Sequence, residues 1–187
     1  SIKAATSHAV YGCDVQQAVL DDAIADGAID GTGTMTDGTY DMIILCLHQR
    51  IAIQMVQEAL PKIPAGTILV DTCGLKGRMV RDLTYRCRKA DVRYVGTHPM
   101  AGREKNGYYA SIPNLFQNAN LIVTPVDGTD EAALDTVKEL ADQMGFGKIV
   151  TATPMWHDNM IAYTSQLAHV VSSSYVKDFC MDDALSF

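Results

Sequence analysis

Apolar runs that alternate with amphipathic segments constrain the fold of this chain most strongly. The two clearest runs, 41–47 (DMIILCL) and 67–71 (TILVD), are continuously apolar, as strands are when both faces of a parallel sheet are covered. Helices with apolar residues on one side are expected between such runs, for example at 50–60 and 130–144. Strands that alternate with helices predict an α/β fold, in which a mostly parallel, doubly wound sheet carries helices on both faces.

The same alternation extends over most of the chain. From His157 onward, however, it gives way to one long helix that still continues at Tyr175. We therefore expect an α/β domain over 1–154 and the start of an all-helical domain over 155–187. The remaining expected strands are 8–12, 93–96, 120–124 and 148–151, and the remaining expected helices are 15–27, capped by Asp14, and 76–90.

Composition narrows the class of protein. The 187-residue chain has a formal net charge of −7, which argues against nucleic acid or an anionic membrane as the main partner. No apolar stretch approaches the roughly 20 residues of a membrane span, and no signal-peptide pattern precedes the first strand, so we expect a cytoplasmic protein. No metal site is expected, because the five cysteines lack zinc-like spacing. Buried positions in a reducing compartment are expected for them: Cys13, Cys46, Cys73, Cys87 and Cys180.

Three residues that follow strands are candidates for cofactor binding, because parallel α/β sheets bind ligands at the carboxyl ends of their strands. Asp14 follows Tyr11-Gly12-Cys13, where dinucleotide-binding sheets carry an acid that accepts hydrogen bonds from the adenosine ribose. A carboxylate there favours NAD, since it would repel the 2′-phosphate of NADP. Leu47 and Cys73 are further predicted cofactor contacts. Asp14 would also serve simply as the cap of the helix that follows, and the two roles are compatible.

The glycine-rich turn that normally cradles the pyrophosphate is absent from the sequence. Residues 1–6 have the character of the last turn of the helix that follows such a turn. We therefore expect the first strand and its glycines to lie upstream of Ser1.

The segment 96–107 (GTHPMAGREKNG) is the most informative for chemistry. His98 stands at the predicted carboxyl end of a strand, and imidazole is the side chain best able to exchange a proton near neutral pH. Glu104 adds a carboxylate at the rim of the same loop. By chemistry alone, a turn with a solvent-facing histidine among mixed charges is a slightly better explanation than a catalytic site.

HPMAGxExxG resembles the signature of prephenate dehydrogenases. Four further segments are similar to that family in the same order, namely 11–14 (YGCD), 71–76 (DTCGLK), 115–125 with its Leu-Phe and Thr-Pro ends, and 157–169 with its His-Asp and Ser-x-Leu-x-His elements. The resemblance implies a Rossmann-like NAD-binding domain followed by a helical domain that forms a homodimer. It also implies NAD-dependent oxidative decarboxylation of prephenate to 4-hydroxyphenylpyruvate in tyrosine biosynthesis.

The resemblance further implies roles for single residues. His98 matches the catalytic histidine, which hydrogen-bonds the ring hydroxyl of the substrate, and Glu104 matches a carboxylate at the mouth of the site. His169 matches a substrate-side histidine, and Ser165 shares its helical face through the i, i+4 spacing. Gly74, also expected beside the substrate, stands where the family often has a serine that orients the catalytic histidine.

Other residues leave room for alternatives. Gln166, Ala168 and His48 also depart from the family pattern. The missing glycine turn and Gly74 favour a nucleotide-binding domain that has lost its chemistry, and an arogenate-preferring enzyme is the second alternative. A hydroxyacid or imine reductase of the same fold is a third, although those enzymes lack HPMAGxE.

The charged residues near the motif have simpler explanations. Lys76, Arg103 and Lys105 are the local cations that could meet a dianionic substrate, but a solvated surface position is the simpler expectation for each. For His157-Asp158, an acid that favours the dipole of its own helix is preferred to a catalytic role.

Overall fold

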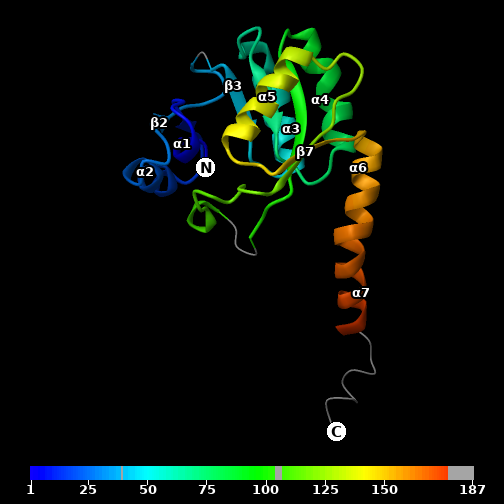
Figure 1. Ribbon diagram of the computed structural model, residues 1–187. Coiled ribbons are helices and arrows are strands. Elements are labelled where there is room, and N and C mark those ends of the chain that lie inside the picture. The colour runs from blue at the N-terminus through cyan, green and yellow to red at the C-terminus, as the bar shows by residue number, and fades with distance from the viewer. Residues whose placement is uncertain (39, 104–106, 177–187) are drawn as a thin grey trace.

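A five-stranded sheet forms the centre of the computed structural model, which describes residues 1–38, 40–103 and 107–176 (Figure 1). The strand order is β3-β4-β5-β6-β7. The first three strands are parallel, β6 runs antiparallel to β5, and β7 is parallel to β6. The mostly parallel α/β sheet is therefore confirmed, with one antiparallel step that the sequence pattern did not predict. The strands are β3 (Met42–Leu45), β4 (Ile68–Asp71), β5 (Arg93–Pro99), β6 (Asn120–Val123) and β7 (Lys148–Thr151).

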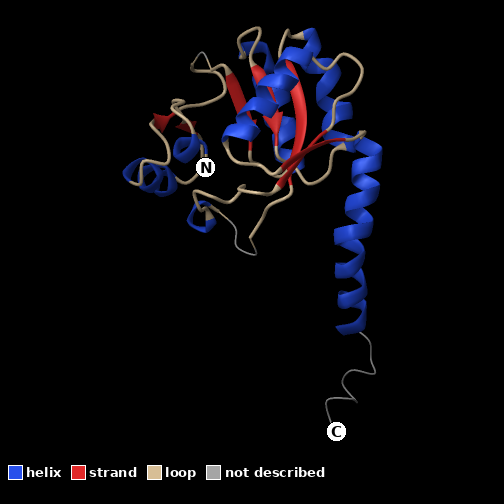
Figure 2. Ribbon diagram, viewed as in Figure 1, coloured by secondary structure: helices blue, strands red, loops and turns tan. Residues whose placement is uncertain are grey.

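Helices cover both faces of this sheet (Figure 2). α3 (Gln49–Ala59) and α4 (Gly77–Lys89) pack on one face, and α5 (Glu131–Gln143) packs on the other. Strand β4 shows why its sequence is continuously apolar: Leu69 joins the core under α3 and α4, whereas Ile68 and Val70 join the core under α5. All four residues of β4 are buried, but β3 lies at the edge of the sheet and is mostly half-buried.

The first forty residues form a smaller unit. They contain α1 (Ile2–Ala5), β1 (Tyr11–Gly12), α2 (Gln17–Ala25) and β2 (Gly31–Thr32), and β1 pairs with β2 in a separate parallel sheet. The strand expected at 8–12 is thus much shorter than predicted. β2 was not expected, because Gly-Thr carries no apolar pattern.

The long helix expected near the end of the chain is confirmed. α6 (Pro154–Ile161), a π-helical turn (Ala162–Gln166) and α7 (Leu167–Val176) follow one another, and this rod projects away from the sheet (Figure 1). It begins three residues before His157, because Thr153 Oγ1 accepts the hydrogen bond of Trp156 N and Pro154 occupies the first turn. Two short 3₁₀ helices, Leu60–Lys62 and Tyr108–Ala110, complete the elements of the described chain.

The cysteines only partly match the expectation of burial. Cys73 and Cys87 are buried, whereas Cys13 and Cys46 are exposed. Cys180 lies outside the described residues. Among the helices that the structure describes, none is long and apolar enough to cross a membrane.

A buried ion pair joins the carboxyl ends of β4 and β5. Asp71 ends β4, and its carboxylate accepts hydrogen bonds from Lys76 Nζ and, at 2.6 Å, from Tyr94 Oη. Lys76 Nζ also donates to the carbonyl oxygen of Thr97. Both charged side chains are fully buried, so Lys76 is not the surface cation that the sequence suggested.

Replacing Lys76 with methionine should destabilise the fold by about 3–5 kcal/mol, because the Asp71 carboxylate would stay buried without its charged partner. Urea unfolding of the full-length protein measures the change in the free energy of unfolding. Lys138→Met is the matched control, since Lys138 pairs with Asp135 on an exposed helix face and such pairs contribute about 0–1 kcal/mol. Equal losses for the two variants would contradict the structural role of Lys76.

Candidate active site

His98 lies in the last part of β5, beyond the residues that pair with β4. There it pairs instead with Ile122 of the antiparallel strand β6. The side chain is half-buried, at the edge of the sheet where β4 also ends. The predicted position of His98 at a strand end is therefore confirmed.

A second histidine contacts the His98 ring. His98 Nδ1 lies 2.8 Å from His157 Nε2, and the two rings meet edge to face. His157 is fully buried, and its Nδ1 lies 2.8 Å from Asp158 Oδ1. Three side chains from β5 and α6 thus form a continuous hydrogen-bonded chain, which we call the His98–His157–Asp158 chain.

The carboxylate of Asp158 is fixed by the start of α4. Its Oδ1 accepts the backbone N–H of Lys76 at 2.7 Å, and its Oδ2 accepts that of Gly77 at 2.8 Å. Burial would raise the pKa of Asp158, but the hydrogen bonds from these N–H groups and from His157 hold that pKa below its ordinary value. The preference for a role at its own helix was wrong, because Asp158 instead satisfies the free N–H groups of a different helix.

The electrostatic surroundings keep His98 uncharged. Burial is the largest cause, and the Lys76 ammonium acts in the same direction, so that the pKa of His98 is lowered to about 4. At neutral pH the imidazole is therefore neutral and can accept a proton. His98 is not the solvent-facing histidine of a surface turn, because its side chain is half-buried and its Nδ1 contacts His157.

Gly74 leaves room beside the other nitrogen of His98. A Cβ built on Gly74 would lie 3.7 Å from His98 Nε2, which is an ordinary van der Waals contact. The structure thus brings Gly74 and His98 together, as expected. While Nδ1 contacts His157, Nε2 lies on the side of Gly74.

The predicted cofactor residues occupy the carboxyl ends of three strands. Asp14 follows β1, is exposed, and accepts the N–H of Gln16 at 2.9 Å, while α2 begins only at Gln17. Leu47 and Cys73 follow β3 and β4 and adjoin each other, with Cys73 Sγ donating to the Leu47 carbonyl at 3.4 Å. The Cys73 side chain is buried, and burial raises its thiol pKa to about 12, so it is not a nucleophile.

Among the described residues, the other predicted site residues make no hydrogen bond to His98. Ser165 is half-buried in the π-helical turn and His169 is exposed on α7, on the rod that projects from the domain (Figure 1). Glu104 and Lys105 lie outside the described residues. Arg103 is exposed, and its guanidinium donates to the Ala110 carbonyl at 2.8 Å.

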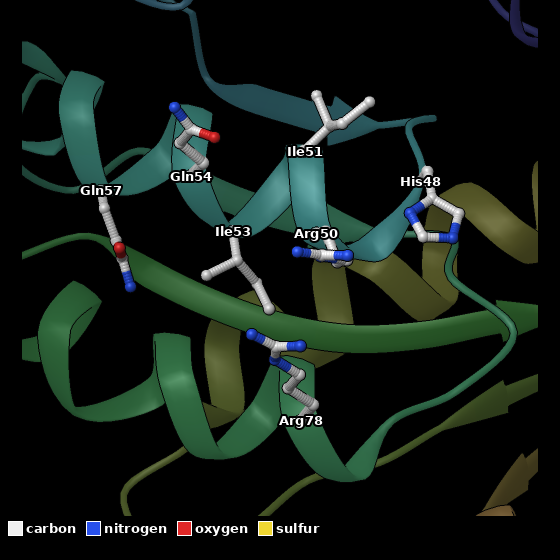
Figure 3. A pocket seen from close by; sticks show the side chains of 7 residues that line it. All are labelled: His48, Arg50, Ile51, Ile53, Gln54, Gln57 and Arg78. Carbon is white, nitrogen blue, oxygen red and sulfur yellow. The ribbon is translucent and has the colours of Figure 1, made fainter.

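A surface groove of about 570 Å³ lies elsewhere, between α3 and α4. Figure 3 shows Arg50 and Arg78 projecting from these two helices into the space between them. Neither His98 nor His157 borders the groove, so it is separate from the candidate active site. The groove is lined by His48, Arg50, Ile51, Ile53, Gln54, Gln57 and Arg78.

The contact between His157 and His98 was not predicted from the sequence, where a catalytic role for His157-Asp158 is weighed but a role at the helix start is preferred. His157 is separated from His98 by 59 positions, and no spacing rule connects residues so far apart. The signals in the sequence are the His-Asp element of the family resemblance and its place near the start of a helix, and both also fit an ordinary helix start.

Comparisons with known proteins agree with this geometry. Residues 1–151 match the model of the prephenate dehydrogenase nucleotide-binding domain. The cyclohexadienyl dehydrogenase of Zymomonas mobilis is 31% identical over 133 residues, which are 71% of this chain and 44% of that protein. The prephenate dehydrogenase of Bacillus subtilis is 28% identical over 170 residues, which are 89% of this chain and 46% of that protein.

A solved structure is similar to this chain over most of its length. Prephenate dehydrogenase from A. aeolicus, in complex with hydroxyphenyl propionate and NAD⁺, superimposes with a TM-score of 0.84 at 28% identity and covers 94% of this chain and 63% of that one. The chain spans less than half the length of these two curated relatives. The family model nevertheless covers most of the chain, and this chain belongs to the prephenate dehydrogenase family.

Proposed function

We propose that the protein carrying this chain is an NAD-dependent dehydrogenase that oxidatively decarboxylates prephenate. The observation that carries the proposal is the arrangement of His98, whose Nδ1 contacts His157 while its Nε2 lies beside Gly74 and its pKa is lowered to about 4. The A. aeolicus relative holds NAD⁺ and an aromatic acid, which is the chemistry expected of such a site. We do not favour a nucleotide-binding domain without catalysis, because the relatives that this chain matches are named as dehydrogenases.

The reaction requires a proton acceptor beside a hydroxyl group. The hydroxyl loses its proton as its ring carbon loses a hydride, which leaves a carbonyl on the ring. The ring carboxylate then leaves as carbon dioxide, its bonding electrons make the ring aromatic, and the resulting phenolate oxygen takes a proton back. Bound NAD accepts the hydride. His98 Nε2 takes the hydroxyl proton, and the protein otherwise contributes orientation.

The described residues fit a bound dinucleotide. Asp14 presents an exposed carboxylate after β1, where it would accept hydrogen bonds from the adenosine ribose. Leu47 and Cys73 would line the path of the cofactor through their main chains, because the Cys73 thiol is buried. We propose that residues 1–154 belong to the NAD-binding domain of this protein.

Substrate recognition would involve residues on both sides of the site. We propose that Gly74 borders the substrate, with Ser165 and His169 approaching from the helical domain and Glu104 from the loop after His98. Prephenate is our proposed substrate, with arogenate as the alternative, and we propose that the protein works in the cytoplasm.

The full-length protein should form NADH with prephenate, and His98→Asn should lower kcat by roughly 10²–10⁴-fold, the usual contribution of a general base. Asparagine keeps an amide donor for His157 but has no basic nitrogen. KM should change much less, because His98 contributes little to binding the two substrate carboxylates. Wild-type kcat should be maintained down to about pH 5 and fall as pH approaches about 4, where His98 takes up a proton.

The control for this variant is His8→Asn, since His8 is exposed near the N-terminus of the chain. It should retain wild-type kinetics. A His98→Asn enzyme with normal kcat and an unchanged acidic limb would refute the proposal. A higher kcat/KM with arogenate than with prephenate would assign the alternative substrate.

Asp14→Ser should narrow the preference for NAD over NADP, because it removes the charge that repels the 2′-phosphate. The serine hydroxyl can still accept the Gln16 N–H, so the local turn should survive. The ratio of kcat/KM for the two cofactors measures the effect. Asp21→Ser is the control, because Asp21 is exposed on α2. If the wild-type enzyme already uses NAD and NADP equally well, Asp14 does not bind the adenosine ribose.

We also propose a homodimer built through the helical domain. The rod beyond Ile161 exposes several large apolar side chains, which an isolated helix in water would not favour. Sedimentation equilibrium of the full-length protein should give twice the monomer mass, and a monomer at micromolar concentration would contradict the proposal. The exposed residues are Tyr163, Leu167, Val170, Val171 and Tyr175.

A further inference from the structure

We propose that His157 and Asp158 are positioning residues that hold His98 in a single tautomer, with hydrogen on Nδ1 and the lone pair of Nε2 facing the substrate. The inference rests on the proposed function, in which Nε2 accepts the substrate proton. It is carried by the His98–His157–Asp158 chain, whose two hydrogen bonds are each 2.8 Å long.

Asp158 determines which atoms donate along the His98–His157–Asp158 chain. Its two oxygens meet the backbone N–H groups of Lys76 and Gly77, which can only donate. The carboxylate is therefore an acceptor at every contact, including the contact with His157. Since Asp158 accepts, His157 Nδ1 must carry the hydrogen of that bond.

His157 transmits this direction to His98. A neutral imidazole has one N–H and one lone pair, so an Nδ1–H leaves His157 Nε2 as an acceptor. The atom facing it, His98 Nδ1, must then be the donor. The remaining nitrogen, His98 Nε2, is left with its lone pair and lies beside Gly74.

The His98–His157–Asp158 chain also supports the proton transfer itself. When Nε2 receives the substrate proton, His98 becomes a cation whose Nδ1–H already points to His157. Asp158 lies at the far end of the chain with a carboxylate held by the start of α4. An oriented dipole followed by a fixed negative charge stabilises the developing cation without rearrangement.

Gly74 explains why this support matters here. The position has no hydroxyl that could orient the imidazole from the Nε2 side, and a Cβ there would only touch the ring. The orienting contact of His98 in the described chain is therefore on Nδ1. Because His157 is fully buried, water does not compete for that bond.

The test compares His157→Phe with His157→Gln in the full-length enzyme. Phenylalanine fills the ring space but accepts no hydrogen bond, whereas the glutamine oxygen can still accept from His98 Nδ1. Partners that fix a histidine tautomer are worth roughly 10–100-fold in metal sites. We expect His157→Phe to lower kcat by about that factor with little change in KM, and His157→Gln to recover most of the loss.

The tautomer is read directly by nitrogen NMR of ¹⁵N-histidine-labelled protein, with the His98 signals assigned from their absence in His98→Asn. We expect hydrogen on His98 Nδ1 in the wild type, and a mixture of tautomers in His157→Phe. Hydrogen on His98 Nε2 in the wild type, or a doubly protonated His157 at neutral pH, would overturn the inference. So would a His157→Phe enzyme that loses stability while its kcat stays normal.

These outcomes separate the inference from the proposed function. The NMR measurement on the wild-type protein requires no substrate, and it reports the tautomer even if no NADH forms with prephenate. Failure of NADH formation would instead refute the proposed reaction.

Discussion

The buried Lys76 is the point at which the separate parts of the candidate site are joined. Its ammonium group bonds the Asp71 carboxylate at the end of β4 and the Thr97 carbonyl in β5, the residue before His98. Its backbone N–H, together with that of Gly77, holds Asp158 of α6. One residue therefore connects two strands and two helices. Because the ammonium group is out of contact with water, it can remain there only while these partners are in place.

This arrangement favours a defined geometry rather than high stability. Burying two charges costs several kcal/mol for each ion, and the attraction between them often does no more than offset that cost. The pair contributes orientation instead. Each of its hydrogen bonds fixes the end of a strand, and the residues that follow belong to the candidate site. β5 leads into His98, and the segment after Asp71 leads to Gly74. A site of this kind depends on position more than on binding strength, since small displacements of reacting groups lower rates strongly.

The sequence predicted the parts of this architecture that depend on local pattern. The apolar run 67–71 specified β4, and HPMAG placed His98 at a strand end. The sequence did not predict the contact between His98 and His157, because the period of a strand or helix carries no information about a partner 59 residues away. Lys76 was assigned to the surface because lysine is rarely buried without a partner, and its partner Asp71 was read only as a strand end. Roles for Asp14, Ser165, His169 and Glu104 remain predictions.

Burial has two opposite consequences for His98. By lowering the pKa to about 4 it guarantees a free lone pair at neutral pH, but it also makes the imidazole a weaker base than one that titrates near the working pH. Two features of the proposed reaction offset this weakness. Aromatisation of the ring supplies driving force as the proton leaves, and the negative charges of Asp71 and Asp158 act to raise the pKa of His98. The Asp158 charge reaches His98 through His157, which contacts Nδ1, whereas the proton is taken up at Nε2. The low pKa thus keeps Nε2 free to accept the proton, and the aromatisation of the ring supplies the driving force that the weaker base lacks.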